Sequence, residues 1–225
     1  MMNLLGFQKL SKPPKPILRG VSHLLACLCA IVGGCLLVKI APSHKAIIAA
    51  IIYSTSLILL FATSSLYHLP TWSIKPRQWL RKLDHAAIFF LIAGSTTPFA
   101  MIALHKNGNS LLWLIWIGSA LGFFQSLFWA HAPKKVSVVI YILLGWAAII
   151  YCPEFYKSIG FMGFLFLLAG GVAYSVGALI YAMKWPNPFP KVFGYHEIFH
   201  AMVIVAAVSH YILIFKIIKS CQTYA

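Results

Sequence analysis

The stretch AIIAAIIYSTSLILLFATSSLYH, residues 46–68, runs without a formally charged side chain as far as its terminal histidine. Its apolar residues are continuous and do not alternate, a pattern that favours a helix over a half-buried strand. About 20 such residues are needed for a helix to cross a hydrocarbon layer of ~30 Å. The stretch therefore predicts a helix that spans a membrane.

The rest of the chain repeats this pattern. Hydrophobic residues make up 61% of the 225 residues, charged residues only 9%, and the mean hydropathy is +0.86, which is more apolar surface than a soluble domain can bury. The predicted fold is an all-α membrane protein, a bundle of seven transmembrane helices. The predicted spans are Ile17–Ile40, Ala46–Tyr67, Ala86–Leu104, Leu111–Ala130, Val136–Cys152, Gly160–Met183 and Tyr195–Lys216.

The distribution of lysine and arginine predicts the orientation. With a cytoplasmic N-terminus, the inner segments hold twelve basic residues and the outer segments hold six. Because short cytoplasmic loops carry the excess of basic residues, this count favours an internal N-terminus and an external C-terminus. The predicted organisation is a basic cytoplasmic segment at 1–16, a transmembrane domain at 17–219 and a short external tail at 220–225.

The net charge of +15 and the five cysteines carry less information. The basic residues are spread over many loops and form no stripe, so nucleic acid is not an expected partner. The cysteines show no C-x-x-C spacing, and three of them lie inside the first predicted span, where cysteine behaves as a small apolar residue. No disulfide framework is expected.

Four ionisable residues fall at one depth in this topology. His68 ends the second span, Asp84 precedes the third, and His196 and His200 begin the seventh, all on the predicted cytoplasmic side. An ionisable group at a membrane-embedded helix end is costly unless it has a partner or a function. Three imidazoles and a carboxylate match a zinc site that keeps one position for water. Zinc is therefore the predicted cofactor.

Each of these residues also has a structural explanation. Ser64 and His68 share one helix face at i and i+4, so Ser64 can bond its own helix while His68 lies among the lipid headgroups. Asp84 is a favoured N-cap residue for the third span. Residues 196–200 read HEIFH, the H-E-x-x-H pattern of metalloproteases in which the glutamate is the general base, but a five-residue pattern also occurs by chance.

The chain resembles bacterial members of the hemolysin III family, which are related to the progestin and adipoQ receptors and to alkaline ceramidases. The matching segments are SSLYH at 64–68, LDHAAIFFLIAGSTTPF at 83–99 and FGYHEIFH at 193–200, followed by Ser209-His210-Tyr211. The resemblance implies seven spans in a bacterial inner membrane. It also implies zinc held by His68, His196 and His200, with Asp84 reaching the metal through a water and Ser64 nearby.

The leading functional hypothesis is a zinc-dependent hydrolase of lipid amide or ester bonds. Asp84 and Ser64 are its candidate catalytic residues, and a membrane lipid is the expected partner. Three alternatives stay open. The zinc could be structural in a receptor-like or membrane-homeostasis sensor, the chain could be an intramembrane metalloprotease using Glu197, or it could form a hemolysin-type pore. The lead-in to Ser22-His23 is basic where relatives are acidic, so no role is assigned to His23.

Overall fold

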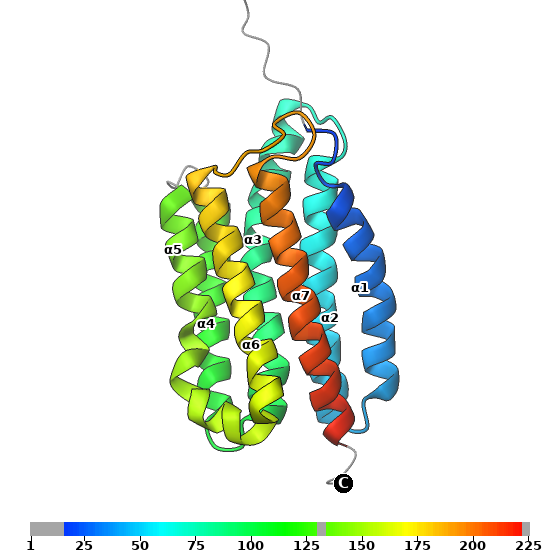
Figure 1. The fold of residues 1–225 in the computed structure, drawn as a ribbon, viewed down its shortest axis with the longest axis vertical. Helices are drawn as coiled ribbons and strands as arrows, with labels where there is room; N and C mark the ends of the chain where they lie inside the picture. Colours follow the sequence, from blue (N-terminus) through cyan, green and yellow to red (C-terminus); the bar gives the residue numbers. More distant parts are fainter. Residues whose placement is uncertain (1–15, 130–133, 222–225) are drawn as a thin grey trace, which may run out of the picture.

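A computed structural model describes residues 16–129 and 134–221 of the chain. In these ranges the chain forms seven α-helices that lie side by side along one long axis (Figure 1). A π-helix, η1 (Phe99–Ala103), follows α3, and a 3-10 helix, η2 (Ala147–Tyr151), follows α5. The α-helices are α1 (Val21–Ile40), α2 (His44–His68), α3 (Ile74–Pro98), α4 (Gly108–Phe128), α5 (Lys134–Gly145), α6 (Cys152–Met183) and α7 (Tyr195–Ser220).

The surface of the bundle is apolar, as lipid requires. Leu25 on α1 is 59% exposed, and Trp113 and Leu121 on α4 are 70% and 69% exposed. Six helical stretches of the described chain are long and apolar enough to cross a membrane, namely α1, α2, α3 with η1, α4, residues 136–183 and α7. The chain is therefore an all-α integral membrane protein. The count of seven spans stays a prediction, because residues 136–183 form one continuous apolar stretch by length and composition.

The start of the third helix differs from the prediction. Asp84 was expected to cap a helix beginning at Ala86, but α3 begins ten residues before Asp84, at Ile74, after Ser73 as N-cap. Residues 74–83, IKPRQWLRKL, are good helix formers, and Pro76 sits in the first turn, where its missing N–H leaves no bond unmade. A hydropathy pattern misses this part of the helix because it is polar. Asp84 is therefore an interior helix residue.

Other helix boundaries also differ from the predicted ones. The predicted fifth span, 136–152, is interrupted at Trp146, where α5 gives way to η2. The predicted start of the sixth span at Gly160 is a kink inside α6, since Gly160 has φ +67° and Gly accepts a positive φ without strain. The seventh helix continues past Lys216 to Ser220. The predicted segments 1–16 and 220–225 lie outside the described residues, except for Pro16, Ser220 and Cys221.

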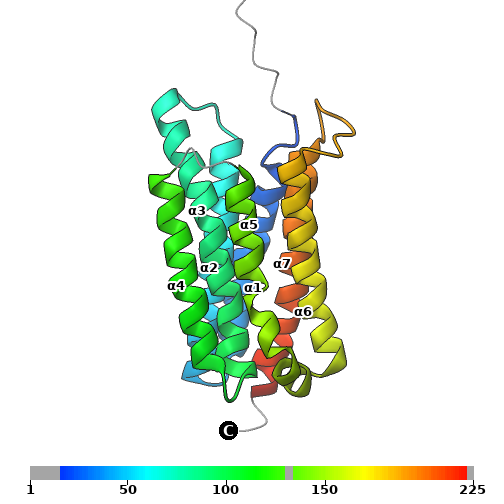
Figure 2. The same cartoon turned by 90° about the vertical axis from the view of Figure 1, so that its left-hand side faces the viewer.

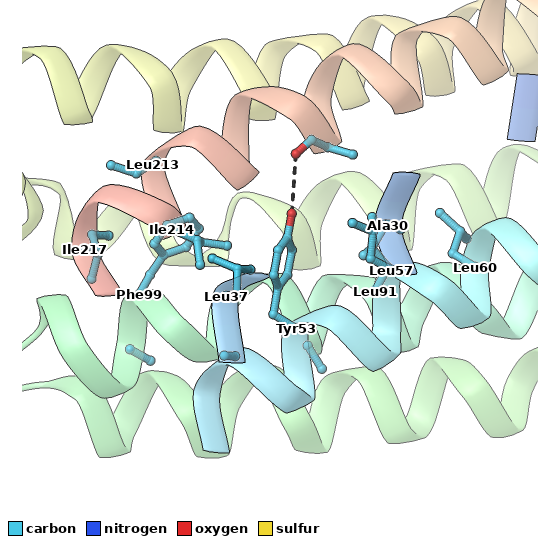
Figure 3. Close-up of a cluster of buried hydrophobic side chains, with 14 of the residues drawn as sticks. Ala30, Leu37, Tyr53, Leu57, Leu60, Leu91, Phe99, Leu213, Ile214 and Ile217 are labelled. Carbon is cyan, nitrogen blue, oxygen red and sulfur yellow. Dashed lines mark hydrogen bonds between the residues drawn. The ribbon is translucent and has the colours of Figure 1, made fainter. Parts of the chain in front are cut away.

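A hydrophobic core runs along the bundle and includes the C-terminal half of α7. Leu37, Leu213 and Ile214 are at most 1% exposed and come from α1 and α7 (Figure 3). Tyr53 of α2 is buried among them, and its hydroxyl donates a hydrogen bond to the carbonyl oxygen of Ala207 at 3.4 Å (Figure 3). This packing fixes α7 against α1 and α2, and thereby sets where the start of α7 lies at the other end.

At that other end the chain before α1 is attached to the loop before α7. The amides of Ile17 and Leu18 donate to the carbonyl oxygens of Lys191 and Val192 at 3.1 and 3.4 Å. Gly20 has φ +87°, and a Cβ at this position would collide with the side chain of His68. Glycine is therefore required for α1 to begin against the last turn of α2. Figure 2 shows the starts of α1 and α7 at the same end as the end of α2.

Candidate metal centre

The three histidines predicted as ligands come together. His68 is the last residue of α2, and His196 and His200 lie one turn apart at the start of α7. One ring nitrogen from each lies within 4.8 Å of the other two, and the Nε2 atoms of His68 and His196 are 3.1 Å apart. Two nitrogens bound to tetrahedral zinc at ~2.0–2.1 Å lie ~3.3 Å from each other. The cluster could hold one metal ion.

The environment of the cluster suits a bound cation. His68 is 7% exposed and His200 is 2% exposed, so both are largely shielded from bulk solvent. Among the described residues, Nδ1 of His200 finds no hydrogen-bond partner. Buried polar atoms are nearly always satisfied by a protein group, a water or an ion. The donor set contains imidazoles and no thiolate, which suits zinc as well as other borderline first-row metals.

Asp84 lies beside the histidines and not among them. Its Oδ2 is 3.9 Å from Nε2 of His68 and 3.8 Å from Nδ1 of His85, and its side chain is 15% exposed. Both distances exceed a hydrogen bond. Ser64 lies one turn before His68 on α2 and is 2% exposed. The structure thus brings both predicted catalytic residues to the cluster. A contact through water stays a prediction.

His23 belongs to this cluster although the sequence assigned it no role. Its ring stacks on that of His200 with centroids 3.8 Å apart and planes 10° apart. Its Nδ1 is 2.8 Å from Oγ of Ser64, so His23 holds the Ser64 hydroxyl in place. The available signal was the Ser22-His23 pair at the same depth as His68. Depth alone did not show that this side of α1 faces α2 and α7.

Glu197 has a different position from the base of a metalloprotease. Its Oε1 accepts a hydrogen bond from Nε of Arg19 at 2.6 Å, and its Oε2 accepts one from the backbone N–H of Gly194 at 2.8 Å. The carboxylate is 2% exposed. It therefore caps α7 and binds the segment before α1 to that cap. This ion pair connects the segment before α1 to the start of α7, because Arg19 precedes Gly20 and Glu197 follows His196.

A cavity of about 580 Å³ opens beside the cluster and is lined by residues from all seven helices. At one end it contacts His68, Asp84 and the start of α7, and it extends along α7 as far as His210. Its middle wall includes Ile88 and Leu91. An elongated cavity with an apolar wall and a polar end accommodates an amphiphile, with the chain inside and the polar part near the histidines.

Comparison with known proteins identifies the relatives of this chain. Residues 11–211 match the family model described as haemolysin-III related. Hemolysin-3 of Bacillus cereus is 33% identical over 193 residues, which cover 84% of each chain. The human monocyte to macrophage differentiation factor is 26% identical over 210 residues, covering 90% of this chain and 84% of the relative. The adiponectin receptor protein of Drosophila melanogaster is 26% identical over 216 residues, covering 84% of this chain and 48% of the relative.

The family match includes every residue of the cluster, from His23 to His200, and ends one residue after His210. The match to the Bacillus cereus protein covers most of both chains, so the likeness concerns the whole transmembrane unit and not a shared hydrophobic segment. The chain belongs to the haemolysin-III-related family.

Proposed function

We propose that this protein is a zinc-dependent hydrolase that cleaves an amide or ester bond of a membrane lipid. The observation that carries the proposal is the placement of Asp84 and Ser64 beside three converging histidines, at one end of a cavity whose lining is mostly apolar. A structural metal needs the histidines only. The carboxylate, the hydroxyl and the adjoining cavity are what hydrolysis of a lipid needs in addition.

In this proposal each residue of the site has its own role. His68, His196 and His200 would hold the zinc, which supplies a Lewis acid and activates water at neutral pH when bound. Asp84 orients the attacking water, accepts its proton and returns that proton to the amine or alcohol that departs as the acyl bond breaks. Ser64, held by His23, donates a hydrogen bond to the carbonyl oxygen of the substrate as negative charge develops there. The wall around Ile88 and Leu91 receives the acyl chain and keeps bulk water out.

Two of the alternative functions are less well supported by the geometry. A metalloprotease would need Glu197 free to act on water, whereas its two oxygens are engaged by Arg19 and Gly194. A pore former would need a polar path through the whole bundle, but the cavity lining along α7 ends at His210, beyond which Leu213 and Ile214 are buried in the apolar core. The receptor-like alternative with a structural zinc makes the same three-histidine cluster. It differs in predicting that no lipid is turned over.

The seven-span topology is part of the proposal. The starts of α1 and α7 lie at one end and Ser220 lies at the opposite end, which an odd number of passes requires (Figure 1). We expect a reporter fused to Ala225 to give an extracytoplasmic signal, because the predicted basic asymmetry places the N-terminus inside. A cytoplasmic signal from that fusion would reverse the orientation and move the metal centre to the other face.

The test of the function is turnover by purified protein in lipid. Zinc-loaded protein is expected to release fatty acid from at least one member of a panel of ceramides, N-acyl lipids and phospholipids, and protein treated with a chelator is not. Mass spectrometry of the released acid identifies the bond that is cut. Absence of release from the whole panel, with zinc bound and the protein folded, would favour the structural-zinc alternative.

A further inference from the structure

One face of α3 carries three kinds of side chain in a fixed order along the cavity. The residues of this face that line the cavity follow each other at steps of four and three, which is the spacing of a single helix face. They are Arg77, Arg81, Asp84, Ile88, Leu91 and Ser95. From the start of the helix inward, the wall is therefore basic, then acidic at the metal centre, then apolar at Ile88 and Leu91, and its last residue is Ser95.

The rise per residue of an α-helix gives the separation of these residues along the helix axis. Arg77 lies ~10 Å along the axis on one side of Asp84, and Leu91 lies ~10 Å on the other. Lys82, the next residue after Arg81, also lines the cavity. A ligand whose reacting bond lies at Asp84 thus has one part among cationic side chains and the other among apolar ones.

The acidic side chains of this protein are engaged with groups other than Arg77 and Lys82. It contains three acidic side chains, and all three are described. Glu197 is bonded to Arg19, Asp84 faces His68 and His85, and Glu154 accepts hydrogen bonds from the backbone of His105 and Lys106 at the other end of the bundle. Within the described chain, neither Arg77 nor Lys82 forms an ion pair.

Basic residues at this end are expected for orientation alone, so their number is not informative. Their placement is. Lys75 and Lys191 lie at the same end of the bundle and are exposed, and neither lines the cavity. Arg77, Arg81 and Lys82 line it together with the metal centre. The Lys82 ammonium lies over the exposed Trp79 ring, 4.7 Å from its centroid, at the rim of the cavity. The basic charge on α3 is therefore placed where a ligand in the cavity can meet it.

We propose that the cavity selects single-chain amphiphiles whose head group is anionic, a carboxylate or a phosphate, and binds that head group at Arg77, Arg81 and Lys82. This inference rests on the proposed hydrolase, because it places the acyl bond at Asp84 when the chain fills the apolar part. The substrate class is then an acyl chain joined by an amide or ester to an acidic head, and not a neutral lipid.

Binding can be measured without turnover by using ligands that contain no amide or ester. Hexadecyl phosphate, hexadecanoate, hexadecanol and hexadecyltrimethylammonium share one chain and differ in head-group charge. In competition against a fluorescent amphiphile, zinc-loaded protein is expected to bind the two anions about tenfold more tightly than the alcohol, with a preference that falls as salt is added. Inorganic phosphate alone is expected to compete weakly, since it lacks the chain.

Matched variants assign the preference to the cavity. Arg77→Gln with Lys82→Gln is expected to reduce the preference to within about twofold while leaving the zinc content unchanged, and Lys75→Gln with Lys191→Gln removes the same charge and is expected to leave the preference intact. Equal loss in both pairs, equal binding of anion and alcohol, or tight binding of phosphate alone would each overturn the proposal. A retained anion preference without hydrolysis of any lipid would contradict the proposed function and leave this binding site in place.

Discussion

Purified protein is expected to contain about one zinc ion per chain, and His196→Ala is expected to lose it. The physical reason is that three imidazole nitrogens converge within 4.8 Å, and a site reduced to two protein ligands binds zinc far more weakly. Metal analysis by mass spectrometry measures the content, and X-ray absorption measures the ligands. We expect nitrogen or oxygen scatterers at ~2.0–2.1 Å and no sulfur.

His23→Phe is the matched control for this prediction. It removes a fourth histidine from the same cluster but keeps a flat ring against His200, so zinc is expected to stay. Loss of zinc from His23→Phe as complete as from His196→Ala would make His23 a ligand. Zinc–sulfur scattering, or full metal content in a His68→Ala and His200→Ala double variant, would show that the cluster is not the metal site.

Asp84→Asn is expected to lower lipid hydrolysis by about 10²–10⁴-fold while most of the zinc stays bound, because an amide can orient water but cannot accept its proton. The measurement is the rate of fatty acid release per zinc-loaded chain, together with zinc content and thermal stability. If Asp84→Asn changes stability alone in a protein that turns over no lipid, the metal is structural. If Asp84→Ala removes the metal outright, Asp84 is a direct ligand.

Glu197→Gln separates the hydrolase from the metalloprotease. Glu197 follows His196 by one residue and points about 100° away from it around the helix, and its carboxylate is bonded to Arg19. The variant is expected to be less stable, since a buried guanidinium–carboxylate pair is broken, and to keep its rate per folded, zinc-loaded chain. A rate loss as large as that of Asp84→Asn would make Glu197 the base.

The arrangement of helices around the site was only partly accessible from the sequence. Asp84 was expected to be a helix cap because hydropathy detects the part of a helix that lies in lipid, and the preceding turns of α3 are polar. His23 and Ser64 are 41 residues apart, and Arg19 and Glu197 are 178 apart. Helical periodicity tells which residues share a face, but it does not tell which helix that face meets.

The sequence by itself determined that the protein lies in a membrane and at which depth its site lies. Continuous apolar stretches require helices in a membrane, and their order places His68, Asp84 and His196 at one depth. Only the tertiary structure decided that α1 contributes His23, that Glu197 binds Arg19, and that α3 lines a cavity with basic residues on one side of the metal centre and apolar residues on the other. Depth follows from the transfer of each segment into lipid, which is a local property, whereas lateral neighbours follow from the packing of all the helices at once.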